Sequence, residues 1–139
     1  MKKIAVLTGA GISTSAGIPD FRGPEGVWTK HPEQQSVYDI DAFLHDQQAR
    51  EYSWRWQKES PVWNAQPGEA HKALALLEQA GMLTLLATQN FDALHEKAGN
   101  TDKVIVNLHG TIGTSHCMTC HAKYDTADIM DRLDEQPDP

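Results

Sequence analysis

The chain has 139 residues, of which 40% are hydrophobic, and this is enough for one domain with a core of its own. Its net charge of −7 argues against a large nucleic-acid-binding face. No apolar run approaches the roughly 20 residues that a membrane-spanning helix needs. We therefore expect no direct nucleic-acid partner, no membrane partner and a cytoplasmic location.

The first predicted element is a strand over residues 4–7, a short apolar run that turn residues bound at once. The glycines of Thr8-Gly9-Ala10-Gly11 would let a ligand approach the backbone closely. Residues 12–16 can begin a helix whose free N–H groups would face a phosphate. Thr14 stands where the usual dinucleotide fingerprint has its third glycine. On the glycines alone, a plain strand-to-helix turn is therefore an equal alternative to nucleotide binding.

The next segment, Gly17-Ile18-Pro19-Asp20-Phe21-Arg22, ends that helix early, because glycine and proline are poor helix formers. It predicts a loop that carries an acid, an aromatic and an arginine beside bound phosphates. The turn-rich stretch from Gly23 to Trp28 follows it, and a simple surface connection is the alternative there.

Residues 39–58 are predicted to be helical, with Asp39 or Asp41 as the N-cap. Trp54 and Trp56 lie two residues apart and cannot share one helix face. One of them is expected to face a ligand groove or a second element, although an aromatic core under a helical cap is the favoured interpretation.

From residue 69 onward the chain alternates helix and strand. The predicted elements are a helix over 69–79 ended by Gly81, a strand over 83–88, a short helix over 93–98 closed by Gly99, and a strand over 104–108. The predicted helix over 69–79 has an apolar stripe of Ala70, Ala73, Leu74, Leu77 and Ala80. This alternation predicts an α/β fold with a Rossmann-like, doubly wound parallel sheet. Polar residues follow three strands, at Gly9–Ser13, Gln89–Asp92 and His109, and ligands bind at that edge of such sheets.

Cys117-Met118-Thr119-Cys120 has the spacing that places two thiolates at two corners of a zinc tetrahedron. A redox pair is the alternative, but no thioredoxin-like context surrounds it. His116 and His121 flank the pair and are candidate additional ligands.

Three blocks of this sequence resemble those of the sirtuins, a family of NAD-dependent protein deacylases. Gly9-Ala10-Gly11-Ile12-Ser13 and Gly17-Ile18-Pro19-Asp20-Phe21-Arg22 are similar to the family signature. Residues 88–95 are similar to its second motif, with Phe91 where the family usually has isoleucine. The resemblance covers nearly the whole chain but only about half of a sirtuin core, so the chain is identified as an N-terminal portion of one.

The resemblance implies a partial catalytic domain with an NAD-binding part at 1–35 and 67–113, a helical insertion at 36–66 and the start of a zinc-binding module at 114–139. It implies NAD contacts from Gly9, Ala10, Gly11, Ser13, Ile18, Asp20, Phe21, Arg22, Trp28, Gln89, Asn90, Phe91 and Asp92. Zinc in the family is held by four cysteines, and Cys117 and Cys120 would supply half of them.

The resemblance also implies the chemistry. Acylated-lysine proteins are the expected substrates, with nicotinamide and acyl-ADP-ribose as products. His109 would be the general base, a role that the ordinary histidine pKa near 6.5 suits, and Asn90 would also act in catalysis. Protein ADP-ribosylation and an inactive NAD- and zinc-binding fragment are the alternatives, and we expect the 139 residues alone to be inactive.

One further pattern concerns the acyl group. Tyr52-Ser53-Trp54-Arg55 resembles the Tyr-x-x-Arg pair that selects succinyl- or malonyl-lysine in one sirtuin branch. An arginine fork with a phenol suits a carboxylate. Chance or surface packing explains Tyr52 and Arg55 equally well.

Overall fold

The computed structural model describes residues 2–139, and for Ser36 and Val37 it describes only the backbone. The chain divides into two compact units. We call the part up to Asp20 together with Pro61–Ile112 the sheet unit, and Phe21–Ser60 together with Gly113–Pro139 the helical unit. Each is described by itself. None of the helices between residues 2 and 139 is long and apolar enough to cross a membrane.

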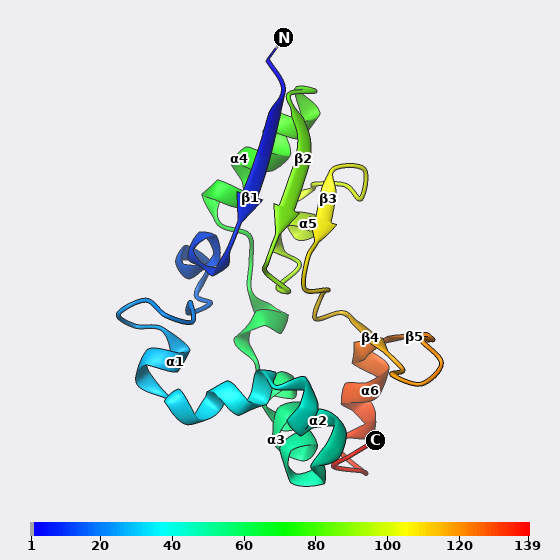
Figure 1. Cartoon of the computed structure of the whole chain (residues 1–139). Coiled ribbons are helices and arrows are strands. Elements are labelled where there is room, and N and C mark those ends of the chain that lie inside the picture. The colour runs from blue at the N-terminus through cyan, green and yellow to red at the C-terminus, as the bar shows by residue number, and fades with distance from the viewer. Residues whose placement is uncertain (1) are drawn as a thin grey trace. The chain divides into compact units, whose positions relative to one another are not determined.

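The sheet unit is built on three parallel strands in the order β1-β2-β3 (Figure 1). They are β1 (Ile4–Thr8), β2 (Leu83–Thr88) and β3 (Ile105–Asn107). The helices between them are η1 (Ala10–Ala16) and η3 (Pro61–Asn64), both 3-10, and α4 (Glu69–Gln79) and α5 (Leu94–Ala98). The prediction of a Rossmann-like α/β fold with a parallel sheet is confirmed. Within this chain the strands lie side by side in the same order as in the sequence.

The core of the sheet unit lies between the sheet and α4. Leu83, Leu86 and Val104 are buried there, and Leu74 and Leu77 of α4 pack against them. In Figure 1 both α4 and α5 lie behind the sheet. The apolar strands are therefore buried on one face only, because side chains such as Leu7 on the other face stay exposed.

Two local predictions in this unit need correction. The face of α4 that packs on the core includes His71, Leu74 and Ala75. Ala70 and Ala73 of the predicted apolar stripe are exposed instead, so the predicted buried face was wrong at these two positions. The predicted last strand is one residue shorter at each end, and at its start the backbone N–H of Val104 donates to the carbonyl of Thr101 in a turn.

The helical unit begins with α1 (Val27–Lys30), η2 (Pro32–Tyr38), α2 (Ile40–His45) and α3 (Gln47–Lys58). The single helix predicted over 39–58 is wrong, because Asp46 interrupts it with an extended backbone (φ −120°, ψ 114°). The Asp46 carboxylate accepts from the N–H groups of Gln48 and Ala49, and these bonds begin a new helix. Asp39 caps α2 in the same way, as predicted.

The second part of the helical unit is a short hairpin of β4 (Thr114–His116) and β5 (Lys123–Asp125), followed by α6 (Thr126–Arg132). Aromatic rings pack along the first part of the unit. The ring of Trp54 lies 5.6 Å from that of Phe43, and the ring of Trp56 lies 5.2 Å from that of Tyr38. Each tryptophan thus meets a different aromatic partner, as expected from their spacing.

Candidate functional site

The segments that follow the three strands remain joined beyond the strand ends. The backbone N–H of Gln89 donates to the carbonyl of Thr8 at 3.0 Å, and that of Leu108 donates to the carbonyl of Thr88 at 2.9 Å. The glycine turn, the Gln89–Asp92 segment and His109 are therefore brought to one edge of the sheet, where open α/β sheets bind ligands.

Ser13 is the centre of a buried hydrogen-bond network at this edge. Its side chain is fully buried, and its hydroxyl donates to Oδ2 of Asp92 at 2.5 Å. The amide of Asn90 donates to Ser13 Oγ at 3.2 Å and to the carbonyl of Gly9 at 3.1 Å. Asn90 and Asp92 thus turn to the same side, and together they fix the glycine turn to the second motif.

His71 is a third partner of Ser13, and the sequence analysis did not single it out. The backbone N–H of Gly68 donates to His71 Nδ1 at 3.2 Å, so the proton of the neutral ring lies on Nε2. That nitrogen then donates to Ser13 Oγ at 3.4 Å. Burial lowers the pKa of His71, although the nearby Asp92 acts in the opposite direction. A histidine within an otherwise apolar helix stripe was the available signal.

His95 forms the floor beneath this network. It is 1% exposed, its Nε2 lies 2.9 Å from Thr8 Oγ1, and its ring centre is 4.9 Å from that of His71. Burial lowers the pKa of His95, and the neighbouring His71 lowers it further. His95 thus packs beneath the network from α5, and it links this helix to Thr8 at the end of β1.

Asp92 links the start of α5 to the glycine turn. Oδ1 accepts from the backbone N–H of Leu94 at 3.0 Å and so starts α5, while Oδ2 accepts from Ser13. Ala93 between them adopts a left-handed backbone with φ 57°. The carboxylate is thereby held from two sides.

His109 is exposed beside this network and is oriented by one bond. Its Nδ1 lies 2.8 Å from the carbonyl oxygen of Gln89. A carbonyl only accepts, so Nδ1 carries the proton and the neutral ring keeps a lone pair on Nε2. The imidazole is thus in the tautomer that a general base needs.

The surface of the glycine turn is open. A Cβ built on Gly11 would meet no atom within 4 Å, and one on Gly9 would meet only Gln89 Oε1 at 3.7 Å. Within residues 2–139, Oδ1 of Asn90 has no hydrogen-bond partner. Ala10, Ile18, Asp20 and Phe91 are half-buried in the same unit. The turn therefore has both the space and a free acceptor that a nucleotide would use.

The other predicted NAD contacts, Phe21, Arg22 and Trp28, belong to the helical unit. The Phe21 and Trp28 rings lie 4.8 Å apart, and the Arg22 guanidinium lies 4.9 Å from the centre of the Trp28 ring. Tyr38 packs edge-on against both rings, and burial raises its pKa. Trp28 Nε1 is buried and has no hydrogen-bond partner in the described part of the chain.

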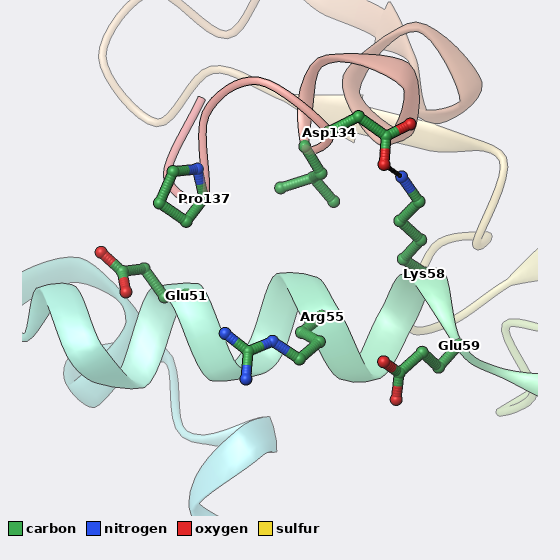
Figure 2. A pocket seen from close by; sticks show the side chains of 7 residues that line it. Glu51, Arg55, Lys58, Glu59, Asp134 and Pro137 are labelled. Carbon is green, nitrogen blue, oxygen red and sulfur yellow. Dashed lines mark hydrogen bonds and ion pairs between the residues drawn. The ribbon is translucent and has the colours of Figure 1, made fainter.

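Tyr52 and Arg55 are both exposed on α3. Arg55 lines a cavity of about 500 Å³, which Tyr52 does not line. Figure 2 shows Arg55 between Glu51 and Glu59 along the helix, with Lys58 reaching Asp134 on the other side. The two carboxylates one turn away on either side offset the charge of the guanidinium.

Cys117 and Cys120 are free thiols in the turn between β4 and β5. The turn is closed by hydrogen bonds from Cys117 N to the carbonyl of Ala122 and from His121 N to the carbonyl of Cys117, both 2.9 Å. The backbone N–H of Cys120 lowers the pKa of the Cys117 thiol. Across residues 2–139, no three His, Cys, Asp or Glu side chains are grouped so that they could hold a metal ion.

Comparison with known proteins identifies the family, because residues 9–139 match the model of the Sir2 family. The chain belongs to the Sir2 family. A Streptomyces coelicolor relative called NAD-dependent protein deacetylase 2 is 38% identical over 97% of this chain and 56% of its own length. The NAD-dependent protein deacetylase of Thermotoga maritima is 42% identical over 96% of this chain and 52% of its own.

Solved Sir2 structures share the fold of this chain. A Sir2 variant with a deacetylated p53 peptide and 3′-O-acetyl-ADP-ribose has a TM-score of 0.82 and 41% identity, over 96% of this chain and 52% of that one. A Sir2 homologue variant in complex with ADP-ribose has a TM-score of 0.79 and 38% identity, over 89% and 48%. The Sir2 chain described here spans about half the length of the relatives it matches.

Proposed function

We propose that this Sir2 chain provides the NAD-binding edge and the general base of an NAD-dependent protein-lysine deacylase. The observation that carries the proposal is the orientation of His109. Its Nδ1 proton is held by the Gln89 carbonyl, so Nε2 is a free base beside the Ser13–Asn90–Asp92 network. The names of the Sir2 relatives, which are NAD-dependent deacetylases or deacylases, support the same activity.

NAD would supply an ADP-ribosyl group that accepts the acyl group, with nicotinamide as the leaving group. The open backbone of Gly9 and Gly11 would approach the phosphates. The free Oδ1 of Asn90 and the Asp92 carboxylate suit the ribose hydroxyls and the nicotinamide carboxamide. Ala10, Ser13, Ile18, Asp20, Gln89 and Phe91 of the sheet unit, and Phe21, Arg22 and Trp28 of the helical unit, are the further proposed contacts.

His109 would accept the proton of a ribose hydroxyl at Nε2, so that this oxygen can attack the acyl carbon. Protonation makes the ring a cation, and the hydrogen bond from Nδ1 to the Gln89 carbonyl then becomes charge-assisted and stronger. The backbone carbonyl thus both fixes the tautomer and stabilises the imidazolium.

The Cys117 and Cys120 thiolates would supply two corners of a structural zinc site. The lowered pKa of Cys117 favours the thiolate, which is the form that binds zinc. Two further thiolates would have to come from outside these residues. Two free thiols in one turn also suit a reducing compartment such as the cytoplasm.

The proposed substrates are proteins with acylated lysines, and two classes of acyl group are candidates: acetyl, and the acidic succinyl or malonyl. Tyr52 and Arg55 would favour succinyl- or malonyl-lysine if they face the acyl group, whereas the carboxylates of Glu51 and Glu59 beside Arg55 would disfavour such an anion. Rates on matched acetyl- and succinyl-lysine peptides decide between these two. A strong preference for acetyl-lysine would remove Tyr52 and Arg55 from the proposed site.

A chimera tests the activity directly. In it, these 139 residues replace the matching segment of the Thermotoga maritima deacetylase, which is 52% of that protein's length. With NAD and an acetyl-lysine peptide, we expect equal amounts of nicotinamide, deacetylated peptide and acetyl-ADP-ribose, detected by mass spectrometry. An ADP-ribosylated peptide without acetyl-ADP-ribose would instead indicate ADP-ribosyl transfer, and NAD binding without turnover would contradict the proposal.

A further inference from the structure

The short helix α5 contacts three different segments of the sheet unit through three consecutive side chains. His95 Nε2 lies 2.9 Å from Thr8 Oγ1 at the end of β1. Glu96 Oε1 accepts from Asn107 Nδ2 at 2.9 Å at the end of β3. An isolated helix of five residues is unstable in water, so contacts of this kind hold α5 in place against the strands. Lys97 is the third of these side chains, and from this fixed helix it reaches a segment outside the sheet.

The Lys97 ammonium binds the end of the 3-10 helix η3. Its Nζ donates to the carbonyl of Trp63 at 3.4 Å and to that of Ala65 at 3.3 Å. The last carbonyls of a helix have no partner within the helix, and a lysine side chain can supply one. Hydrogen bonds from a charged donor are also stronger than those between neutral groups. Lys97 therefore ties the end of η3 to α5.

The segment that follows Ala65 is short and stiff, and it leads to Gly68. Pro67 has a fixed φ, and it also restricts the backbone of the residue before it. The Gly68 backbone lies close against η1, because a Cβ built on it would be 2.8 Å from Ser15 Oγ. A shift of Ala65 is therefore transmitted to Gly68, since few backbone rotations between them can absorb it.

Gly68 sets the tautomer of His71. Its N–H donates to His71 Nδ1 at 3.2 Å, so the ring proton lies on Nε2, which donates to Ser13 Oγ. Without the Gly68 bond, either ring nitrogen can carry the proton. A ring protonated on Nδ1 cannot donate to Ser13. The hydroxyl that binds Asp92 would then keep the Asn90 amide as a donor and lose the imidazole.

We propose that Lys97 is a positioning residue that holds His71 in the tautomer on which the Ser13–Asp92 network depends, through the backbone of residues 63–68. The role requires a long cationic donor, because the Lys97 side chain is exposed and adds little apolar packing. Arginine can also donate to two carbonyls, whereas methionine keeps the length of the side chain and removes every donor. The consequence for NAD rests on the function proposed above, but the tautomer of His71 does not.

Nitrogen NMR of isotope-labelled histidine rings tests the proposal in the chimera. At about pH 8.5 the rings are neutral, and the shifts of the two nitrogens show which one carries the proton. His71 should be protonated on Nε2 alone in the unaltered chimera and in Lys97→Arg, and Lys97→Met should show both tautomers. Lys72→Met is the matched control and should keep the single tautomer. Lys72 is an exposed lysine of α4 whose ammonium binds Glu69 in the same helix.

Titration calorimetry with NAD gives the functional readout. Lys97→Met should raise the NAD dissociation constant at least about fivefold, because the network loses a donor. Lys97→Arg and Lys72→Met should stay within about twofold of the unaltered chimera, since an exposed ion pair contributes little. If Lys97→Met does not fold, Lys97→Gln, which keeps a neutral donor, should show both changes at a smaller size.

Two results would overturn the proposal. One is His71 protonated on Nε2 alone in both Lys97→Met and Lys97→Gln, whatever their NAD affinity. The other is a mixture of tautomers in Lys97→Met with an unchanged NAD dissociation constant. A chimera that does not bind NAD at all would contradict the proposed function instead, and the tautomer of His71 would still decide the role of Lys97.

Discussion

The sheet unit and the helical unit hold their proposed NAD contacts in different ways. In the sheet unit, Ser13, Asn90 and Asp92 are joined by directional hydrogen bonds between buried side chains. In the helical unit, Phe21, Arg22 and Trp28 are held by ring contacts at 4.8 and 4.9 Å. Hydrogen bonds fix atoms within tenths of an ångström, whereas ring packing tolerates several arrangements.

This difference suggests a division of labour. The bonded network fixes the position of the groups that would meet the reacting ribose, while the aromatic cluster forms an adaptable surface. Damage to the network should therefore affect both stability and NAD use strongly, and damage to the cluster should affect them little. The predictions below use the chimera defined above and run from the largest expected effect to the smallest.

Asp92→Ala should have the largest effect. It leaves two buried donors, the Ser13 hydroxyl and the Leu94 N–H, without an acceptor, and each such loss costs about 1–3 kcal/mol. Urea unfolding should show this loss, and titration calorimetry should show much weaker NAD binding. Asp92→Asn keeps one acceptor oxygen and should lose less. Equal stability of Asp92→Ala and the unaltered chimera would contradict the network.

Ser13→Ala should come second, because it removes a hydroxyl that His71, Asn90 and Asp92 share. We expect a loss of about 1–3 kcal/mol in the free energy of unfolding, together with weaker NAD binding. Ser15→Ala, at an exposed position two residues away, is the control and should stay within about 0.5 kcal/mol. If both variants behave alike, the burial of Ser13 has no energetic consequence.

The histidine pair predicts a pH dependence. Burial holds the pKa values of His71 and His95 below the ordinary histidine value. The unfolded chain therefore binds protons first as the pH falls through about 6.5, and stability is present above that pH and lost below it. The thermal midpoint should fall between pH 7.5 and 5.5, and His71→Gln should flatten that fall. His45→Gln, at an exposed position, should leave the fall of the thermal midpoint unchanged. The same pH dependence in His71→Gln and His45→Gln would contradict the role of the buried histidines.

Arg22→Gln should have the smallest effect. It removes a cation over the Trp28 ring at an exposed position, where such contacts contribute about 0.5–1 kcal/mol. Urea unfolding should show a loss no larger than this, and the affinity for NAD should fall less than for Ser13→Ala. A loss of unfolding free energy larger than that of Ser13→Ala would contradict the claim that the hydrogen-bond network contributes more than the aromatic cluster.

The sequence was informative where a local pattern has a direct structural consequence. β2 and α4 have the predicted bounds, because an apolar run between turn signals and a helix closed by Gly81 are both local patterns. Gln89, Asn90, Asp92 and His109 were placed at one edge because strand ends in a parallel sheet share it.

Other features depend on contacts that no local pattern contains. His71 meets Ser13 across 58 residues, and His95 meets Thr8 across 87. The break at Asp46 depends on a competition between a side-chain cap and continuation of the helix, and propensity alone did not resolve it. The exposed sheet face follows from strand order, which the element sequence leaves open.

The role of His109 is the central claim, and its replacement tests it most directly. In the chimera, His109→Ala should retain the NAD dissociation constant and reduce the single-turnover rate of acetyl-ADP-ribose formation by about 10²–10⁴. His45→Ala is the matched control, because His45 is also exposed with its Nδ1 on a backbone carbonyl, that of Asp41 at 3.0 Å. A single-turnover rate of His109→Ala within about threefold of the control, at saturating NAD, would contradict the account.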